Sequence, residues 1–240
     1  MGLLAIILML RLHNMQVYFD HKLGWEEHHD IQLFNMYAKV GLNEEHEALE
    51  QGWLMDDNKT WYQSRNTRIN LENFTPKDTI KLKVTTTYNH GIISRIYSNY
   101  IKSKGFKDLY NPVITILDRD KFIVYTDEHN VAVAFSKVRR YRNNSLESRQ
   151  FCWDYADPRL RLGILSVHEE IKLAIKGGAK YYYLGPSYEE SCIYKANFDG
   201  FEWWTGSEWS QDKKLFKKLL RRDSKIKTLQ ELKDIMTYEA

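Results

Sequence analysis

The chain has few cysteines and little net charge, and each shortage excludes a class of protein. Two cysteines in 240 residues, Cys152 and Cys192, cannot form a disulfide framework or a four-cysteine metal site. A reducing, cytoplasmic setting is therefore expected. The net charge of +3 is too small to argue for nucleic acid by itself. The apolar fraction of 43% and the length suit one globular domain or two small ones.

Several motifs that signal particular chemistries are also missing. The sequence has no GxxxxGKS or GxxxxGKT phosphate loop, no GxGxxG, no HExxH and no GxSxG. The adjacent His28 and His29 have no further partners at ligand spacing, so no metal site is expected. ATP hydrolysis on a phosphate loop, nicotinamide chemistry and zinc hydrolysis are therefore disfavoured.

The N-terminus holds an apolar run that is too short to cross a membrane. Residues 3–10 are apolar, whereas a membrane-spanning helix needs roughly 20 residues. No basic residue precedes the run and no small-residue cleavage site follows it, which disfavours a signal peptide. We expect either a buried strand or a translation start placed too early, with Met15 opening the domain. Residues 1–14 are accordingly treated as an extension.

Hydrophobic periodicity predicts a mixture of strands and helices. The segments that alternate or are rich in aromatic and β-branched residues are predicted as strands: residues 16–20, 60–71, 80–87, 121–126, 131–138 and 148–155. The segments predicted as helices are residues 30–40, with Asp30 as N-cap, residues 43–51 and residues 92–104.

The last third of the chain has the clearest pattern. Residues 163–176 place Ile164, Val167 and Ile171 on one helical face, and the helix is expected to stop at Gly177-Gly178. Residues 180–185 (KYYYLG) then form a short aromatic strand. A strand, an amphipathic helix and a second strand in this order predict a β-α-β unit inside a mixed sheet, in one α/β or α+β domain.

The run DYADPRLRLGILSVHEEIKLAIKGGAKYYYLG, residues 154–185, combines a turn, a helix start and an aromatic strand. It resembles the core of the arginyl- and leucyl-tRNA–protein transferase family, whose pattern is a YYDP turn, an LSLG helix start and a YYYLG strand. The directly matching positions are Leu162, Gly163, Tyr181, Tyr182, Tyr183, Leu184 and Gly185. The resemblance implies a GNAT-like acyltransferase fold over residues 15–210, with a mixed central sheet flanked by helices. In that fold, the loop and helix N-terminus after a splayed strand bind the donor.

The resemblance extends in order over residues 45–200. The family's Gly-Trp, Tyr, Arg-Ile and Phe positions correspond to Gly52-Trp53, Tyr62, Arg68-Ile69 and Phe74, and residues 96–106 and 131–138 are similar to a later helix and strand. Residues 194–202 also resemble the ending of the peptidoglycan-branching aminoacyl-tRNA transferases, which share the fold. Both comparisons imply an aminoacyl donor.

Departures from the family leave its regulation and its acceptor open. Its N-terminal cysteine cluster is missing, its arginine pair after Gly-Trp reads Leu54-Met55, and its SCPKMRYK segment is contracted to residues 191–195. The GNAT acetyltransferases hold the coenzyme A pyrophosphate on a loop at a helix N-terminus. Residues 160–165 keep the central Gly163 of that loop without its leading Gln or Arg, which disfavours acetyl-CoA.

The candidate catalytic residues are Asp154, Asp157 and Tyr183. Asp154 and Asp157 flank the turn before the donor loop, where a carboxylate could orient or deprotonate an attacking amine. Asp157 alternatively starts the turn ahead of Pro158. Strand alternation places Tyr182 on the face opposite Tyr183, so the phenol of Tyr183 lines the acyl cleft or packs in the core.

The binding candidates are assigned by the same resemblance. Those for the donor are Leu162, Gly163, Tyr181, Leu184, Gly185 and Lys195, and those for the acceptor or an anion are Trp53, Tyr62, Arg65 and Arg68. Arg65 and Arg68 are expected to share one face of a strand and to grip an anion together, with ordinary surface charge as the alternative. A solvated charge is likewise the alternative for Lys195, and Cys192 is expected to be a small buried residue.

Residues 211–240 are expected to form a basic amphipathic helical segment. Residues 213–222 separate an apolar side, formed by Leu215, Phe216, Leu219 and Leu220, from the cations Lys213, Lys214, Lys217, Lys218, Arg221 and Arg222. A docking helix with a solvated basic face and a helix that contacts a phosphate backbone both fit this pattern.

The sequence thus leads to an aminoacyltransferase hypothesis. The enzyme would move an amino acid from aminoacyl-tRNA to an amine, such as a protein N-terminus, by direct attack on the ester. Positioning, a hydrogen bond to the oxyanion and removal of one proton suffice, so no metal or cofactor and no membrane partner are expected. The alternatives are an acyl-CoA-dependent N-acetyltransferase, transfer to a modified nucleobase, and a non-catalytic nucleic-acid-binding module.

Overall fold

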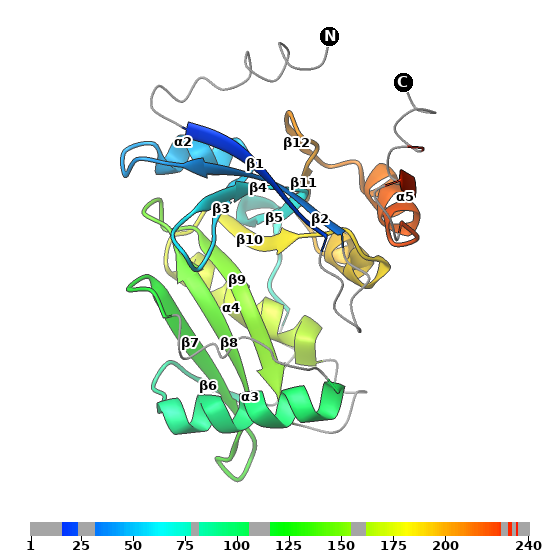
Figure 1. Ribbon diagram of the computed structural model, residues 1–240. Helices are drawn as coiled ribbons and strands as arrows, with labels where there is room; N and C mark the ends of the chain where they lie inside the picture. Colours follow the sequence, from blue (N-terminus) through cyan, green and yellow to red (C-terminus); the bar gives the residue numbers. More distant parts are fainter. Residues whose placement is uncertain are drawn as a thin grey trace. The chain divides into compact units, whose positions relative to one another are not determined.

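The structure is a computed structural model that describes residues 16–23, 32–77, 82–105, 116–154, 162–226, 230, 231 and 234, with side chains from Met36 onward (Figure 1). The chain forms two compact units. Unit 1 comprises residues 1–68 and 185–240, and unit 2 comprises residues 69–184. The limits expected from the sequence at residues 15 and 211 stay predictions.

Unit 2 is built on a mixed sheet. Its strands are β6 (Lys83–Thr85), β7 (Asp120–Thr126), β8 (Ala132–Arg140), β9 (Leu146–Trp153) and the first part of β10 (Tyr181–Pro186), up to Leu184. They lie in the order β10-β9-β8-β7-β6. β10 is parallel to β9, and the other neighbours are antiparallel. The predicted mixed sheet and its β-α-β unit are therefore confirmed.

Two helices cover opposite faces of this sheet. α3 (His90–Lys104) begins after Asn89, whose side chain accepts a hydrogen bond from Gly91 N at 2.6 Å. It packs on the face formed by Phe122, Val124, Phe135 and Cys152. α4 (Leu162–Lys176) contributes Leu173 to the other face, formed by Ile123, Tyr125, Ala134 and Val138. Neighbouring strand residues point to opposite faces, so unit 2 has helix, sheet and helix layers.

Unit 1 contains a four-stranded antiparallel sheet in the order β1-β2-β4-β3. Its strands are β1 (Gln16–Leu23), β2 (Gln32–Lys39), β3 (Trp53–Met55) and β4 (Trp61–Gln63), and α2 (Glu45–Glu50) lies before β3. The start of β5 (Asn66–Asn70) neighbours β11 (Phe201–Trp204), which pairs with β12 (Trp209–Ser210). The short helix η1 (Leu71–Asn73) belongs to unit 2, and η3 (Glu190–Asn197) and α5 (Lys213–Asp223) belong to unit 1.

α5 is an amphipathic helix packed through one side. Asp212 caps it by accepting hydrogen bonds from Lys214 N and Leu215 N, both at 2.9 Å. Phe216 and Leu220 are buried in a cluster with Ala196, Phe201 and Trp203. The helix predicted over residues 213–222 is confirmed. Leu215, predicted on its apolar side, is 41% exposed because one residue turns a helix by about 100° away from Phe216.

Gly52 allows a close approach that any other residue would prevent. It follows α2 with φ of +76°, in the left-handed region that favours glycine. A Cβ added there would lie 2.4 Å from the ring of Trp204. The Gly-Trp pair that the sequence singles out is therefore needed for packing within unit 1.

One predicted helix is a strand. The sequence predicts a helix over residues 30–40, but β2 lies there and pairs along its whole length with β1, as well as with β4. The prediction is wrong because a short segment of mixed apolar and polar residues fits both periods. Backbone pairing with a strand on each side favours the extended form.

The other predicted elements agree with the structure within a few residues. The strand predicted over 60–71 is divided into β4 and β5 by a bend at Ser64-Arg65, and the strand over 80–87 is reduced to β6 within the described residues 82–87. The short strands β3, β11 and β12 are not predicted. Each contains a tryptophan and is too short for a periodic pattern.

Candidate active site

β9 carries a bulge close to its start. Lys137 of β8 pairs with Gln150, whereas Val138 pairs with Ser148, so Arg149 is an extra residue in β9. A bulge bends its strand and re-aims the side chains beside it, and bulges are frequent next to active sites. The sequence offers no signal for this bulge, because Arg149 looks like an ordinary strand residue.

β10 pairs with β9 over a short distance. Along these two strands, both described in full, the pairing joins Tyr182 to Leu146 and Tyr183 to Glu147, and β9 then runs on to Trp153. Beyond Tyr183 and Glu147 the two parallel strands part. This arrangement matches the splayed strand that the family resemblance implies.

Glu147 lies where the two strands part. Its buried carboxylate accepts hydrogen bonds from Tyr141 OH at 2.5 Å and from Arg149 NH1 at 2.7 Å. The ring of Tyr183 meets that of Tyr141 edge-on, with centroids 5.9 Å apart. Sequence reasoning missed Glu147, Tyr141 and Arg149, because each occupies a strand or turn position that reads as exposed.

A second buried carboxylate lies on the same face of the sheet. Asp120 binds Arg139 through both oxygens, at 2.7 and 3.1 Å, and lies 3.3 Å from Lys137 Nζ. β8 and β9 pair Arg139 with Glu147, so both carboxylates belong to one set of buried charges. We name this set the inner cluster: Asp120, Lys137, Arg139, Tyr141, Glu147 and Arg149. Mutual pairing offsets the cost of burying its charges.

The opposite face, under α4, holds a buried acid. Glu170 is fully buried, and the hydroxyls of Ser136 and Tyr182 donate to its carboxylate. Burial raises the pKa of Glu170 to about 7, although hydrogen bonds from Ser136, Ser148 and Ser166 act to lower it. Near neutral pH this carboxyl group is therefore partly protonated.

The three tyrosines of β10 divide between the two faces as the alternation predicts. Tyr182 reaches Glu170, whereas Tyr183 packs against Tyr141. The ring centroids of Tyr181 and Tyr183 are 6.3 Å apart. All three side chains are buried, so each packs in the core, and the catalytic role of Tyr183 and the donor-binding role of Tyr181 stay predictions.

Asp154 follows β9 and is engaged in an ion pair. Its carboxylate accepts a hydrogen bond from Arg95 NH1 of α3 at 2.5 Å, while its backbone N–H donates to Val133 O at 2.8 Å. The arginine partner fixes the position of this carboxylate. Asp157, the other candidate acid, lies outside the described residues.

The donor-binding candidates of unit 2 lie at the start of α4 and in β10. Leu162 and Leu184 are buried, and Gly163 lies in the first turn of α4. A Cβ added to Gly163 would approach only the Phe151 ring, at the ordinary contact distance of 3.9 Å. Packing among the described residues therefore does not require glycine at position 163.

The remaining donor candidates, Gly185 and Lys195, belong to unit 1. Gly185 has φ of +70° and accepts a hydrogen bond from Thr67 Oγ1 at 2.9 Å. Lys195 is buried, and its ammonium donates to Pro186 O and Ser187 Oγ, both at 3.0 Å. It is therefore not a solvated surface charge.

The ammonium of Lys195 is shifted toward its neutral form. Burial lowers its pKa, although the neighbouring Cys192 and Glu189 act to raise it. Cys192, expected to be buried, is half-buried and packs against the cluster under α5.

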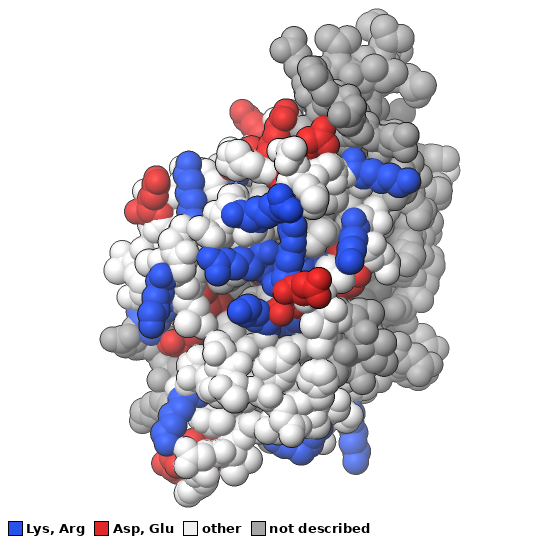
Figure 2. Space-filling view, turned by 90° about the vertical axis from the view of Figure 1, so that its left-hand side faces the viewer, with Lys and Arg blue, Asp and Glu red and all other residues white. Residues whose placement is uncertain are grey.

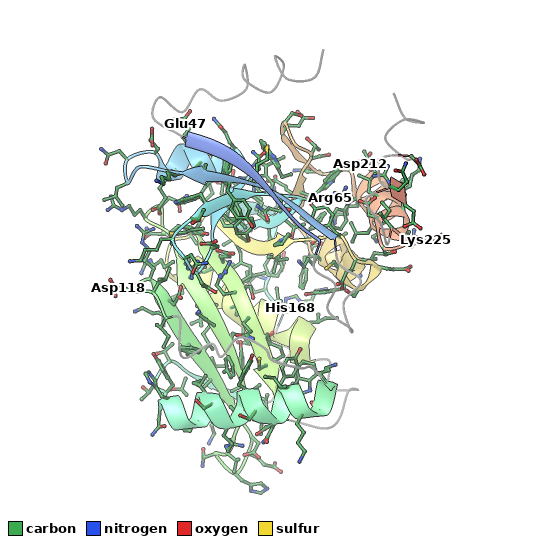
Figure 3. All side chains as sticks on the ribbon, in the orientation of Figure 1. Glu47, Arg65, Asp118, His168, Asp212 and Lys225 are labelled. Carbon is green, nitrogen blue, oxygen red and sulfur yellow. The ribbon has the colours of Figure 1, made fainter. Side chains whose placement is uncertain are left out.

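Arg65 and Arg68 do not converge on one anion. Arg65 NH1 lies 2.5 Å from Asp223 Oδ2, and its guanidinium lies 4.9 Å from the centroid of the Tyr188 ring (Figure 3). Arg68 is buried, with Nε 2.7 Å from Glu202 Oε2. The expected shared face is wrong because residues three apart on a strand point to opposite faces. The bend at Ser64-Arg65 also leaves Arg65 ahead of β5.

The aromatic acceptor candidates lie in the sheet of unit 1. Trp53 on β3 is fully buried and Tyr62 on β4 is 7% exposed. Leu54 pairs with Tyr62 across these strands. Both side chains therefore serve the core of the unit, and their role toward an acceptor stays a prediction.

The cations of α5 differ in their surroundings. Lys213 Nζ donates to Phe198 O at 3.0 Å and Lys217 Nζ to Asn197 Oδ1 at 3.2 Å, so both lie against the chain beside η3. Arg222 lies 2.7 Å from Asp223. The exposed cations of this helix are Lys214, Lys218 and Arg221. The exposed basic face of α5 thus contains three of the six cations that the sequence predicts for it.

Neither a metal cluster nor a membrane helix is found in the part of the chain that the structure describes. No three His, Cys, Asp or Glu residues there gather in a way that could hold a metal ion. No helix there is long and apolar enough to cross a membrane.

Comparisons with known proteins give a weak likeness in structure. No family model matches the chain, and no curated protein matches it. L-PGS from Bacillus licheniformis aligns with a TM-score of 0.39 and 12% identity, over 51% of this chain and 46% of that one. The C-terminal domain assigned to a lysylphosphatidylglycerol synthetase from Agrobacterium fabrum aligns with a TM-score of 0.42 and 11% identity. The alignment covers 51% of this chain and 46% of that one.

A GCN5-related N-acetyltransferase from Kribbella flavida gives a TM-score of 0.38 and 12% identity, over 51% of this chain and 47% of that one. The chain thus spans about half the length of the structures it matches. The resemblance to the arginyl- and leucyl-tRNA–protein transferases stays a hypothesis.

Proposed function

We propose that the chain is an acyltransferase that moves an amino acid from aminoacyl-tRNA to an amine. The observation that carries this proposal is the parting of β9 and β10 at Tyr183, beside the bulge at Arg149. Residues 154–185, whose sequence resembles the transferase family, lead from the end of β9 through α4 to this same point. We further propose that the protein acts in the cytoplasm, where charged tRNA is abundant.

The chemistry needs no covalent enzyme intermediate. The neutral amine nitrogen bonds to the ester carbonyl carbon, the bond from that carbon to the ribose oxygen of tRNA breaks, and the amine proton ends on that oxygen. Tyr183 would position the acyl group, while Asp154 or Asp157 would orient the amine. Because Asp154 is paired with Arg95, we assign it to orientation rather than to proton removal.

The amine that accepts the amino acid has three candidate classes. A protein N-terminus is what the family resemblance implies, and the changed residues Leu54-Met55 leave another amine or a modified nucleobase as alternatives. The exposed cations of α5 would contribute contacts with the tRNA backbone, because each neutralised phosphate adds salt-dependent affinity.

The test is a transfer assay with the full chain. Purified protein is incubated with tRNA charged with labelled amino acids and with a lysate, and label is followed into protein, small amines and RNA. Tyr183→Phe should lower the rate at least about tenfold without loss of folding, since it removes one hydrogen bond made to the reacting group. Tyr88→Phe changes a tyrosine that lies before α3 and outside the inner cluster, and it is the matched control.

Acyl transfer from coenzyme A is the second candidate, because Gly163 lies in the first turn of α4 and helix N-termini bind phosphate groups. A thermal-shift comparison separates the two donors. Stabilisation by acetyl-CoA with none by charged tRNA would overturn the first proposal. RNA binding without turnover of any donor would instead favour a non-catalytic nucleic-acid-binding module.

A further inference from the structure

One end of the unit 2 sheet concentrates positive charge. β7 begins there and β8 ends there, and Arg140 N donates to Arg119 O at 3.0 Å across the two strands. Residues 117–121 and 137–149 hold seven Lys and Arg against three Asp and Glu. α4 ends and β10 begins at the same end, because β10 pairs with the start of β9, and this adds Lys176 and Lys180.

Some of the acids and bases at this end are buried, and others are exposed. Asp120 and Glu147 are buried and bonded to the cations of the inner cluster. Asp118 and Glu72 are the exposed acids in the described part of this end. The inner cluster buries these two acids together with Lys137 and Arg139, so the charge left at the surface of this end is still positive.

The outward-facing cations form an array. Arg119 lies opposite Arg140 in the backbone, and Lys121 of β7 pairs with Val138, two residues before Arg140 on β8. Positions two apart on a strand are about 6.5 Å apart. We name the array the outer basic surface: Arg119, Lys121, Arg140, Arg142, Lys176 and Lys180. All are exposed except Arg119, which is half-buried.

Figure 2 looks onto this end of unit 2, the side on which Figure 3 labels Asp118, and shows Lys and Arg side chains gathered there with fewer Asp and Glu among them. The turn after β8 adds the polar Asn143 and Asn144, and Asn144 Oδ1 accepts a hydrogen bond from Arg140 NH2 at 2.7 Å. This contact holds the guanidinium of Arg140 over the turn.

We propose that the outer basic surface binds the phosphate backbone of RNA. Three of its six cations are arginines, whose planar guanidinium presents paired donors that match the geometry of a phosphate. A membrane-binding surface would also need a broad apolar face beside its cations. In the described part of this end, Ile175 is the large apolar side chain that is exposed.

This surface belongs to unit 2, whereas α5 belongs to unit 1. The inference goes beyond the proposed function, because RNA can bind here whether or not amino-acid transfer occurs. Its consequence is that nucleic-acid affinity has a component carried by residues 119–142, for which the sequence resemblance gives no indication.

The test measures the affinity of the full chain for a fluorescein-labelled RNA hairpin by anisotropy, over a series of salt concentrations. In the variant R140E/R142E we expect binding to weaken about tenfold or more, and the slope of log K against log salt to fall by about two. The control K102E/K104E makes the same charge change in the last turn of α3 and should bind as the wild type does. R140K/R142K should keep the salt slope.

Several outcomes would overturn the inference. The first is that the wild type does not bind RNA, and the second is that R140E/R142E binds RNA with the affinity of the wild type. The third is that K102E/K104E loses as much RNA affinity as R140E/R142E does. Loss of binding to phosphatidylglycerol vesicles in R140E/R142E, with RNA binding unchanged, would assign the surface to a membrane instead. Thermal melting of each variant verifies folding. Failure of the proposed function looks different: no amino acid is transferred, while RNA binding still depends on Arg140 and Arg142.

Discussion

Glu170 makes the stability of unit 2 depend on pH in a direction opposite to that of an ordinary carboxylate. Its pKa rises from 4.5 to about 7 because the side chain is fully buried beneath α4. Between these values the folded state holds a proton that the unfolded state has released. The free energy of unfolding therefore falls as pH rises through this window, and it is highest below the pKa of the unfolded state.

The size of the effect follows from the two pKa values. The difference corresponds to about 3 kcal/mol in all, of which about 2.5 kcal/mol is lost between pH 5 and pH 8. Glu170→Gln removes the titration and keeps the shape of the side chain, and its amide can still accept from Tyr182. The variant should therefore lack this loss, so that its stability relative to the wild type improves by about 2.5 kcal/mol over the same range.

The assay is urea unfolding followed by circular dichroism at a series of pH values, with the difference between variant and wild type as the quantity of interest. Taking the difference cancels the titration of the other carboxylates. Glu169→Gln removes a charge from the neighbouring position of α4, where Glu169 is paired with Lys172, and serves as the control. A difference for Glu170→Gln that does not change between pH 5 and pH 8 would refute the reasoning.

Two glycines give opposite predictions for the change to alanine. Gly52→Ala should destabilise the protein by about 3 kcal/mol in thermal or urea unfolding, because it combines a left-handed backbone with a Cβ 2.4 Å from Trp204; a loss below about 1 kcal/mol would contradict this. Gly163→Ala should stabilise α4 by up to about 1 kcal/mol. If the donor lies against the backbone there, the same variant loses kcat/KM in the transfer assay, and unchanged activity would remove Gly163 from the site.

The elements of the fold that the sequence predicts well are those with a clear local periodicity of apolar residues. α3 and α4 each place apolar residues at helical spacing, and α4 is followed by two glycines, so their limits follow from the sequence nearly to the residue. β2 shows where this fails. Eight residues with mixed polarity fit either period, and strand pairing with β1 and β4 decides the outcome.

The sequence predicts the order of the backbone elements that form the candidate site, but it does not predict all of the side chains that line it. The order of β9, α4 and β10 led to Tyr183 and to the parting of the strands. Glu147 and Arg149 gave no signal, because a charged residue in a strand ordinarily faces solvent. Only the register of β8 against β9, with its bulge, shows that these residues share a buried face with Arg139.

β10 has a different environment on each of its two faces in unit 2. On the α4 side, the hydroxyl of Tyr182 donates to Glu170. On the other side, the ring of Tyr183 packs against Tyr141, whose hydroxyl donates to Glu147. One strand therefore separates a proton-dependent stabilising network from the charged inner cluster. Substitutions on the α4 side should change the stability of unit 2 and its pH dependence. Substitutions on the opposite side should instead change the binding of the acyl group that we propose between the parted strands. A variant of Tyr183 that alters only stability would place that residue with the core rather than with the site.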